Sequence, residues 1–272
     1  MDFQSVNENG LGLVGCGNMG SALLRGWLAA GLSPSAITVI DPRPSDWLTG
    51  VQASGLRLNQ DMHPDTAVCV LAVKPQIVVD AAPQIVNLGN GRTVFLSVAA
   101  GTSLDTLQTC LGGLTPVVRA MPNTPAAIGQ GITALVANEH VSSRDLALSK
   151  RLMQAVGRVV VLQDESQMDA VTAVSGSGPA YVFHLVEALA AAGEKHGLPA
   201  DIALELARAT VSGAGAMALQ SDETPGQLRQ NVTSPNGTTA AALEVLMDER
   251  HGFNNLLERA VAAAKLRSQQ LG

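Results

Sequence analysis

The sequence is poor in aromatic residues and in cysteine, and each shortage limits what the protein can be. Aromatic residues make up 3% of the 272 residues, whereas hydrophobic residues of all kinds make up 46%. We therefore expect a core of aliphatic side chains and alanine. The three cysteines, at positions 16, 69 and 110, are far apart. We interpret them as buried small hydrophobic residues rather than as a disulfide framework or a metal site.

Positive charge and long apolar runs are also scarce. The formal net charge is −6 at pH 7, which argues against nucleic acid and anionic membranes as partners, because both bind basic surfaces. No segment approaches the roughly 18 uninterrupted apolar residues of a membrane-spanning helix. Residues 1–4 have neither the basic nor the apolar stretch of a leader peptide. Together with the unpaired cysteines, these features favour a cytoplasmic location.

Catalytic signatures built on side chains are missing as well. The five histidines are scattered, and the sequence has no His-Glu-x-x-His, Cys-x-x-Cys or Ser-His-Asp pattern. No pair of carboxylates suggests acid–base chemistry. We therefore expect no metal, and a reaction carried out by a bound cofactor that the protein orients.

The most informative segment that is present is residues 11–20, LGLVGCGNMG. A short apolar run leads into a G-x-G-x-x-G pattern, and a helical pattern over residues 21–30 follows at once. This context is typical of a dinucleotide-binding turn. Gly15 allows a tight turn, Gly17 lets the backbone approach a pyrophosphate, and Gly20 lets the helix pack closely on the strand. The free N–H groups at the start of the helix would hold the phosphates.

From residue 11 to about residue 162, short β-branched runs alternate with helical patterns. The runs are continuously apolar, as expected for parallel strands buried on both faces. They fall at residues 11–14, 37–40, 67–73, 93–98 and 116–121, and residues 132–137 and 158–162 could extend the sheet around a helix at 142–156. The sequence thus predicts an α/β fold whose dinucleotide-binding domain, residues 1–163, contains a doubly wound Rossmann-type sheet.

Beyond residue 162 only helical patterns remain. They cover residues 168–174, 179–196, 200–220, 224–232, 238–247 and 253–271. Alanine and glycine are dense in these segments, which favours closely packed helices. Some of the helices have wide apolar faces that the rest of the chain cannot cover. We therefore expect an all-helical second domain, residues 164–272, that forms a homo-oligomer interface.

Loops of small or rigid residues follow three predicted strands, at residues 72–75, 97–101 and 121–125. Because ligands bind at the carboxyl ends of strands in such sheets, these loops predict a pocket wall. Lys74, one of only four lysines, suits the ribose–phosphate part of a cofactor. After the second strand, Asp41 suits a ribose 2′-hydroxyl and so NAD, whereas Arg43 suits a 2′-phosphate and so NADP. These two signals conflict, and the cofactor preference stays open.

Residues 234–239, SPNGTT, open one of the C-terminal helices. Backbone N–H groups of small residues at a helix start point outward together, as in a carboxylate-binding site. Thr238 and Thr239 add hydroxyl groups there. An ordinary capped helix start explains the segment equally well.

Taken together, these segments resemble the pyrroline-5-carboxylate reductase family. The resemblance extends from about residue 11 to residue 271 and rests on ordered motifs at residues 15–20, 72–75, 99–101, 119–125, 175–181 and 225–239. It implies a Rossmann domain followed by a helical dimerisation domain, and homodimers that can assemble further into rings. It also implies reduction of L-1-pyrroline-5-carboxylate to L-proline by NADPH or NADH.

The resemblance implies a set of site residues. Those that would contact the cofactor are Val14, Gly15, Cys16, Gly17, Asn18, Met19, Asp41, Arg43, Ala72, Val73, Lys74, Pro75, Val98, Ala99 and Ala100. Those that would contact the substrate are Glu165, Asn231, Gly237, Thr238 and Thr239. Of these, Thr239 is the candidate catalytic residue, with its hydroxyl nearest the imine nitrogen.

Two positions depart from the commonest family pattern. Asn236 stands where a second glycine is usual, and we expect the turn to survive because asparagine tolerates left-handed backbone. Asp41 stands where a small polar residue often meets the 2′-phosphate, so a preference for NADPH is in question.

Two other functions remain open. A β-hydroxyacid dehydrogenase has a similar plan, but it uses a helical lysine as acid–base. Beyond Lys150 the only lysines are Lys195 and Lys265, and neither lies in a glycine-flanked pattern. A non-catalytic nucleotide-binding protein would need no carboxylate site at residues 234–239. The reaction we expect is hydride transfer to the C=N carbon of a cyclic imine, while the protein clamps the carboxylate and excludes water.

Overall fold

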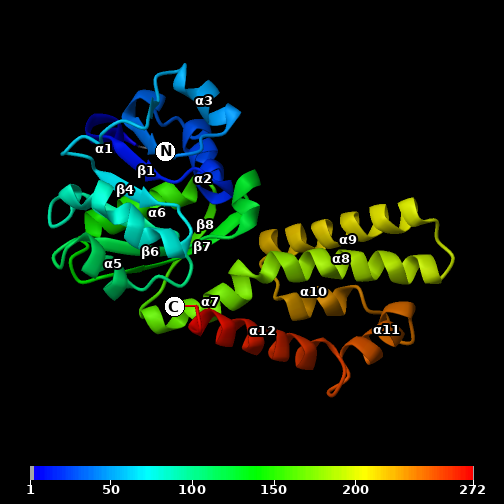
Figure 1. Cartoon of the computed structure of the whole chain (residues 1–272). Coiled ribbons are helices and arrows are strands. Elements are labelled where there is room, and N and C mark those ends of the chain that lie inside the picture. Colours follow the sequence, from blue (N-terminus) through cyan, green and yellow to red (C-terminus); the bar gives the residue numbers. More distant parts are fainter. Residues whose placement is uncertain (1–2, 272) are drawn as a thin grey trace. The chain divides into compact units, whose positions relative to one another are not determined.

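The structure is a computed structural model that describes residues 3–271. It divides into two compact units, which are treated separately here (Figure 1). The first contains the chain up to Gly176 together with the segment from Lys265 onward, and the second contains Ser177–Ala264. The domain boundary after residue 163 stays a prediction, because compactness alone does not define a domain.

The first unit is built on an eight-stranded sheet with the order β3-β2-β1-β4-β5-β6-β7-β8. The strands are β1 (Leu11–Val14), β2 (Ile37–Ile40), β3 (Arg57–Leu58), β4 (Val68–Leu71), β5 (Val94–Ser97), β6 (Val117–Met121), β7 (Gly131–Ala137) and β8 (Gly157–Val161). Neighbouring strands from β3 to β6 are parallel. Strand β7 is antiparallel to β6, and β8 is parallel to β7. The strand order reverses direction between β1 and β4, which confirms the doubly wound prediction.

Helices cover this sheet and bury both of its faces. They are α1 (Gln4–Asn9), α2 (Asn18–Ala29), α3 (Asp46–Gln52), α4 (Val78–Ala81), α5 (Leu104–Leu111), α6 (Ser143–Gln154) and α7 (Met168–Val171). Successive strand residues point to opposite faces. Accordingly, Val68 and Val70 of β4 join an apolar cluster with Leu152 of α6, whereas Cys69 and Leu71 join the other cluster with residues of α4 and α5. The core is therefore aliphatic, as predicted.

One tryptophan is the main aromatic exception in this core. Trp27 of α2 is fully buried, and its indole N–H donates a hydrogen bond of 2.9 Å to the backbone oxygen of Leu152. A buried indole needs such a partner, because an unpaired N–H away from water is costly. The bond fixes α2 against α6, and thereby fixes the helix that begins at the glycine turn.

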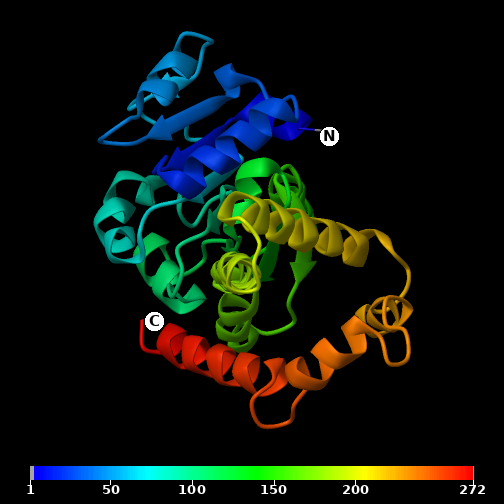
Figure 2. The ribbon, with the colours of Figure 1, turned by 90° about the vertical axis from the view of Figure 1, so that its right-hand side faces the viewer.

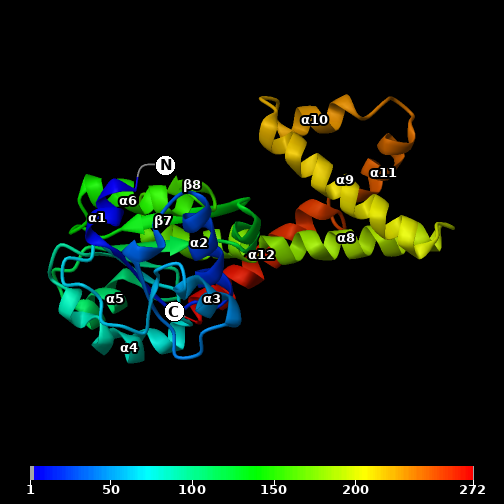
Figure 3. The same ribbon diagram turned by 90° about the horizontal axis from the view of Figure 1, so that it is seen from above.

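The second unit is helical throughout. It contains α8 (Gly178–Lys195), α9 (Ala200–Gln220), α10 (Pro225–Asn231), α11 (Thr238–Leu246) and the first part of α12 (Phe253–Gln269). Helices α8 and α9 pack together; Figure 2 shows α8 end-on with α9 running past it, and Figure 3 shows the two crossing. Their contact buries Ala190, Ala203 and Ala207. Small side chains allow this close approach.

Many apolar side chains of the second unit lie exposed on the single chain. Phe183 of α8 is 63% exposed, Leu206 of α9 52% and Val245 of α11 72%. Among the described residues, α9 alone is long and apolar enough, by length and composition, to cross a membrane. Its most apolar 18-residue stretch has a mean hydropathy of 1.2, and 11% of that stretch is buried. Exposed apolar side chains on several helices favour an interface with another protein chain.

Several element boundaries differ from the predicted ones. Helix α2 begins at Asn18 rather than at residue 21, directly after the glycine turn, and β4 is shorter than the predicted run 67–73. The predicted helix at 168–174 is α7 followed by a π-helical turn over Thr172–Gly176. The sequence analysis missed α1 and the two-residue strand β3. No strand follows β8 in the described part of the chain, as predicted.

Candidate active site

The three glycines of the pattern after β1 differ in what an added side chain would meet. Gly15 has a φ of +87°, and a Cβ there would lie 2.8 Å from the backbone oxygen of Ala72. A Cβ on Gly20 would collide with the backbone oxygen of Gly15. A Cβ on Gly17 would meet no atom within 4 Å. Contacts within the chain thus account for Gly15 and Gly20, but they do not account for Gly17.

Gly17 also lies where a helix presents free N–H groups. It is the N-cap residue of the 12-residue helix α2, and no side chain caps that end. The N–H groups of the first turn have no acceptor within the helix. Exposed N–H groups beside a residue without a side chain form an anion site suited to a pyrophosphate. The residues present therefore fit a dinucleotide cofactor.

The other predicted cofactor residues lie at the same edge of the sheet. Strands β1, β2, β4 and β5 are parallel neighbours, so the loops that follow them meet. The Gly15 N–H donates to the backbone oxygen of Ile40 at 2.8 Å, and the Ala72 N–H donates to that of Val14 at 2.8 Å. The Val98 N–H donates to that of Leu71 at 2.9 Å. The structure thus brings Val14–Met19, Asp41, Arg43, Ala72–Pro75 and Val98–Ala100 to one edge; their contacts with a cofactor stay predictions.

Side chains at this edge differ in exposure. Lys74 is exposed at the N-cap of a 3₁₀ turn that begins with Pro75. Ala99 is buried, and its N–H donates to the Ser97 hydroxyl at 3.3 Å. Ala100 is exposed. After β4 and β5 this edge therefore presents an exposed cation, Lys74, next to the small residues Ala99 and Ala100.

Asp41, at the end of β2, has both carboxylate oxygens hydrogen-bonded. Oδ2 accepts from the backbone N–H of Cys16 at 2.7 Å, and Oδ1 accepts from that of Arg43 at 2.8 Å. The side chain of Asn59 bonds to the backbone of Asp41. Its Oδ1 accepts a hydrogen bond from the Asp41 backbone N–H at 2.8 Å, and its Nδ2 donates one to the Asp41 backbone carbonyl oxygen at 2.9 Å. The sequence analysis missed Asn59, because its importance depends on the short strand β3 that precedes it.

Cys16 lies inside the glycine turn as a buried thiol. Burial, and then the nearby Asp41 carboxylate, raise the pKa of its thiol to about 11, while Arg25 acts in the opposite direction. Its thiol is therefore protonated at neutral pH and serves as a small apolar side chain. Cys69 is also buried and has a raised pKa, whereas Cys110 is only partly buried. The prediction of buried cysteines is thus confirmed for Cys16 and Cys69.

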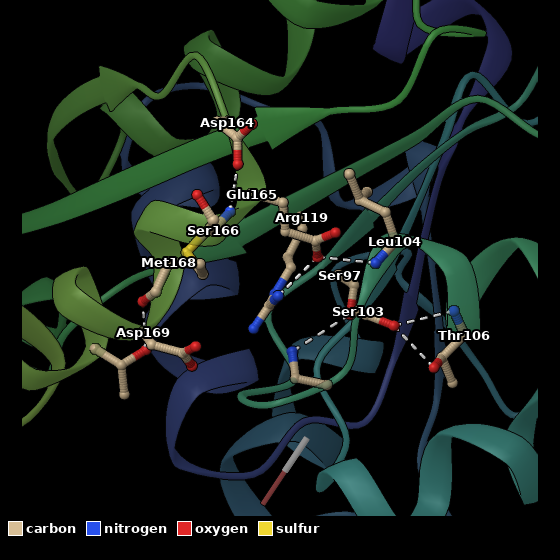
Figure 4. A network of polar contacts seen from close by, with 12 residues as sticks. Ser97, Ser103, Leu104, Thr106, Arg119, Asp164, Glu165, Ser166, Met168 and Asp169 are labelled. Atoms are coloured by element: carbon tan, nitrogen blue, oxygen red, sulfur yellow. Dashed lines mark hydrogen bonds and ion pairs between the residues drawn. The ribbon is translucent and has the colours of Figure 1, made fainter. Parts of the chain in front are cut away.

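Glu165 belongs to a polar network in the first unit (Figure 4). Its Oε1 accepts from Nη1 of Arg119 at 2.7 Å and from the backbone N–H of Leu104 at 2.9 Å. The side chain of Arg119, on β6, is 9% exposed and that of Glu165 is 30% exposed. Sequence analysis gave Arg119 no role, although an arginine within the apolar strand VVRAM is a signal that a buried partner exists. The pair connects β6, the start of α5 and the segment that precedes α7.

Neighbouring residues brace the segment that carries Glu165. Asp164 accepts from Ser166 at 2.7 Å, and hydrogen bonds from Ser166 lower the pKa of its carboxyl group. Asp169 of α7 accepts from the hydroxyl of Ser268 near the C-terminus, also at 2.7 Å. Glu165 is therefore fixed in position rather than free to swing.

The remaining predicted substrate residues lie in the second unit. The Asn231 amide donates to both carboxylate oxygens of Glu223 at 3.1 Å and accepts from Gln227 at 2.9 Å, so its orientation is set. Asn236 has a φ of 58°, which confirms that asparagine supports the left-handed turn there. Gly237 is the N-cap of α11, and no side chain caps that helix.

The hydroxyl-bearing residues follow directly at the start of α11. Thr238 is exposed and Thr239 is half-buried. An uncapped helix start with these two hydroxyls matches the carboxylate site that the sequence suggested. Its role in binding stays a prediction.

Comparison with known proteins agrees with this geometry. Residues 165–271 match the family profile described as pyrroline-5-carboxylate reductase dimerisation, and residues 10–101 match the one described as NADP oxidoreductase, coenzyme F420-dependent. The chain is 41% identical to a pyrroline-5-carboxylate reductase of Pseudomonas aeruginosa over 96% of each sequence. The chain belongs to the pyrroline-5-carboxylate reductase family.

Solved structures of this family are also similar. A pyrroline-5-carboxylate reductase from Coxiella burnetii has a TM-score of 0.91 and 36% identity, covering 97% of this chain and 98% of that one. A pyrroline carboxylate reductase from Plasmodium falciparum with NADP bound has a TM-score of 0.81 and 29% identity, covering 98% and 99%. The dimerisation domain of the family corresponds to residues 165–271 of this chain. These residues include most of the helices that have exposed apolar side chains.

The described residues contain no group of three or more His, Cys, Asp or Glu side chains that could hold a metal ion. The predicted substrate residues of this family member fall on both units. Glu165 belongs to the first, whereas Asn231, Gly237, Thr238 and Thr239 belong to the second.

Proposed function

We propose that the protein is a pyrroline-5-carboxylate reductase that forms L-proline by NAD(P)H-dependent reduction of L-1-pyrroline-5-carboxylate. The observation that carries the proposal is the similarity to reductases of this name over nearly the whole chain, at 41% identity for the one from Pseudomonas aeruginosa. The open space at Gly17 beside the uncapped start of α2 supports it independently. When bound, the reduced nicotinamide supplies a hydride to the C=N carbon.

The residues of the chain bind the cofactor and the substrate and orient them for the reaction. The turn from Val14 to Met19 holds the pyrophosphate through backbone N–H groups, and the loops at Ala72–Pro75 and Val98–Ala100 line the rest of the cofactor site. The uncapped start of α11 at Gly237 binds the substrate carboxylate. The imine is protonated before reduction, so the protein needs little acid catalysis and contributes chiefly position and the exclusion of water.

Thr239 is the residue we place nearest the reacting atoms. Its hydroxyl would hydrogen-bond the ring nitrogen, directly or through water. Asn231, oriented by Glu223 and Gln227, contributes a second polar contact with the substrate. Glu165, fixed by Arg119, contributes the third.

The assembly we propose is a homodimer built on the helical C-terminal part, with dimers joining further into a ring. The exposed apolar side chains of α8, α9 and α11 support the dimer. We place the enzyme in the cytoplasm, a reducing compartment, which suits three free cysteines.

The proposal is tested by following NADH and NADPH oxidation with pyrroline-5-carboxylate, then with the six-membered homologue, and finally with β-hydroxyacids and NAD(P)⁺. We expect turnover of the five-membered imine. Oxidation of β-hydroxyacids instead would indicate a dehydrogenase. Cofactor binding without turnover of any of these compounds would discard the reductase and leave a nucleotide-binding protein of unknown substrate. In Thr239→Ala, kcat/KM should fall at least about tenfold, the effect of losing one hydrogen bond to a charged group; full activity would exclude the role given to Thr239.

A further inference from the structure

The side chain of Asp41, which bears on the choice between NADH and NADPH, is restrained by hydrogen bonds at both carboxylate oxygens. Cys16 and Arg43 each donate a backbone N–H to one oxygen of the Asp41 carboxylate, at 2.7 and 2.8 Å. Cys16 belongs to the glycine turn after β1, whereas Arg43 follows Asp41 by two residues in the turn after β2. A carboxylate held at both oxygens cannot rotate out of the site without losing a hydrogen bond.

Asn59 restrains the backbone of the same residue. It occupies the left-handed region, with a φ of 52°, directly after β3, and its own N–H donates to the Val39 oxygen at 2.8 Å. From there its amide bonds both the N–H and the oxygen of Asp41, at 2.8 and 2.9 Å. Left-handed backbone is uncommon for residues other than glycine, and asparagine is one of the few that adopt it readily. In Asn59 it directs a single side-chain amide at both backbone polar groups of Asp41.

This restraint decides what Asp41 can accept. Each carboxylate oxygen has two lone-pair sites, and each accepts one backbone hydrogen bond from the chain. A second site on each oxygen thus remains for a ribose hydroxyl, which can donate a proton. A 2′-phosphate is mostly the dianion at neutral pH, with a charge of about −1.5 to −2, so it is chiefly a hydrogen-bond acceptor. The phosphate would lie next to the negatively charged Asp41 carboxylate, which its two hydrogen bonds keep from rotating away.

Neither of the two arginines near this turn compensates for the carboxylate. Arg43 belongs to the same turn as Asp41, so the two together add no net positive charge. Arg25, which also acts on the turn, has its guanidinium 3.6 Å from the centre of the Trp47 ring, where stacking holds it.

We propose that Asp41 makes this enzyme prefer NADH to NADPH and that Asn59 is the positioning residue that keeps Asp41 in place. The inference rests on the proposed function, because it concerns the cofactor of the same reaction. It resolves the conflict between Asp41 and Arg43 in favour of Asp41.

The test is equilibrium binding of NADH and of NADPH, measured by nicotinamide fluorescence without imine. The wild-type protein should bind NADH at least about tenfold more tightly, which corresponds to about 1.4 kcal/mol. Asp41→Ser should remove that preference. Asn59→Gly keeps the left-handed backbone without strain and deletes the amide, so it should weaken NADH binding several-fold while NADPH binding stays equal or tightens.

Asn90→Gly is the matched control. Asn90 is also left-handed, with a φ of 54°, and its side chain accepts from the Leu114 N–H, away from the glycine turn. It should leave the ratio of the two dissociation constants unchanged. The inference is overturned if the wild type binds NADPH as tightly as NADH, or if Asn59→Gly weakens both cofactors by the same factor.

Two outcomes separate this inference from the proposed function. If neither cofactor binds, both are wrong. If the expected ratios are found but pyrroline-5-carboxylate is not reduced, the inference stands and the proposed function fails.

Discussion

Replacing Gly17 and Gly20 by alanine, one at a time, separates a glycine that the ligand requires from one that the fold requires. A Cβ at Gly17 meets nothing within 4 Å, and the residue has a φ of −68°, which alanine adopts easily. A Cβ at Gly20 collides with the backbone oxygen of Gly15, which cannot move without shifting the turn. The two substitutions are chemically identical and lie three residues apart, so any difference between them reports their surroundings.

The magnitudes follow from these contacts. Overpacking of this kind costs about 1–3 kcal/mol, and each kcal/mol lowers Tm by about 2–4 °C in a protein of this size. Gly20→Ala should therefore lower Tm by about 4–8 °C for a cost of about 2 kcal/mol. Gly17→Ala should change the free energy of unfolding by less than about 1 kcal/mol, yet weaken NADH binding at least about tenfold, because its methyl group would occupy the place of the pyrophosphate.

Thermal unfolding by circular dichroism and cofactor binding by fluorescence give the two readouts. Gly50→Ala is the control, because Gly50 lies exposed in α3 with open space around its Cα. It should raise Tm slightly, through helix propensity, and leave NADH binding unchanged. Unaltered NADH affinity in Gly17→Ala would refute the assignment of the site.

Three further predictions concern the network, the thiols and the assembly. Glu165→Met should lower the free energy of unfolding by about 3 kcal/mol and Arg119→Met by about 1–2 kcal/mol. The first loss is larger because it leaves the Arg119 cation, which is 9% exposed, without its carboxylate partner. Chemical denaturation measures both losses, and the reverse order would contradict the pairing. At pH 8 iodoacetamide should modify Cys110 and spare Cys16. The pKa of the Cys16 thiol is about 11 instead of 9.0, so its thiolate fraction at pH 8 is about 100-fold lower than that of an unperturbed thiol. The labelling rate of Cys16 should rise only as the pH approaches 11, and rapid labelling of Cys16 in the native protein at pH 8 would refute this. Leu206→Glu, on the exposed apolar face of α9, should convert dimers to monomers in analytical ultracentrifugation, and an unchanged mass would exclude that face from the interface.

The parallel strands and the glycine turn could be predicted because their signals are local. Continuously apolar runs mark buried parallel strands, and β1, for example, has the predicted bounds Leu11–Val14. The spacing of Gly15, Gly17 and Gly20 then indicates the turn. Strand β3 could not be predicted, because two residues, Arg57 and Leu58, are too short a run to show periodicity.

The polar contacts of the site were much less predictable, because they join residues far apart in the sequence. Asn59 supports Asp41 across 18 positions, and Arg119 pairs with Glu165 across 46. Nothing in the residues around Asn59 indicates its partner, since that depends on β2 and β3 being neighbours. The apolar faces of the C-terminal helices, by contrast, were visible as an excess of hydrophobic positions.

In the proposed reaction, the protein transfers a hydride directly from a reduced nicotinamide to the imine carbon of pyrroline-5-carboxylate. The most direct test supplies NADH carrying two deuterium atoms at C4 of the nicotinamide and analyses the proline formed by mass spectrometry and NMR. The account predicts proline with a single deuterium at C5, on the carbon that was doubly bonded to nitrogen. Unlabelled proline, or no proline at all while the cofactor binds, would contradict it.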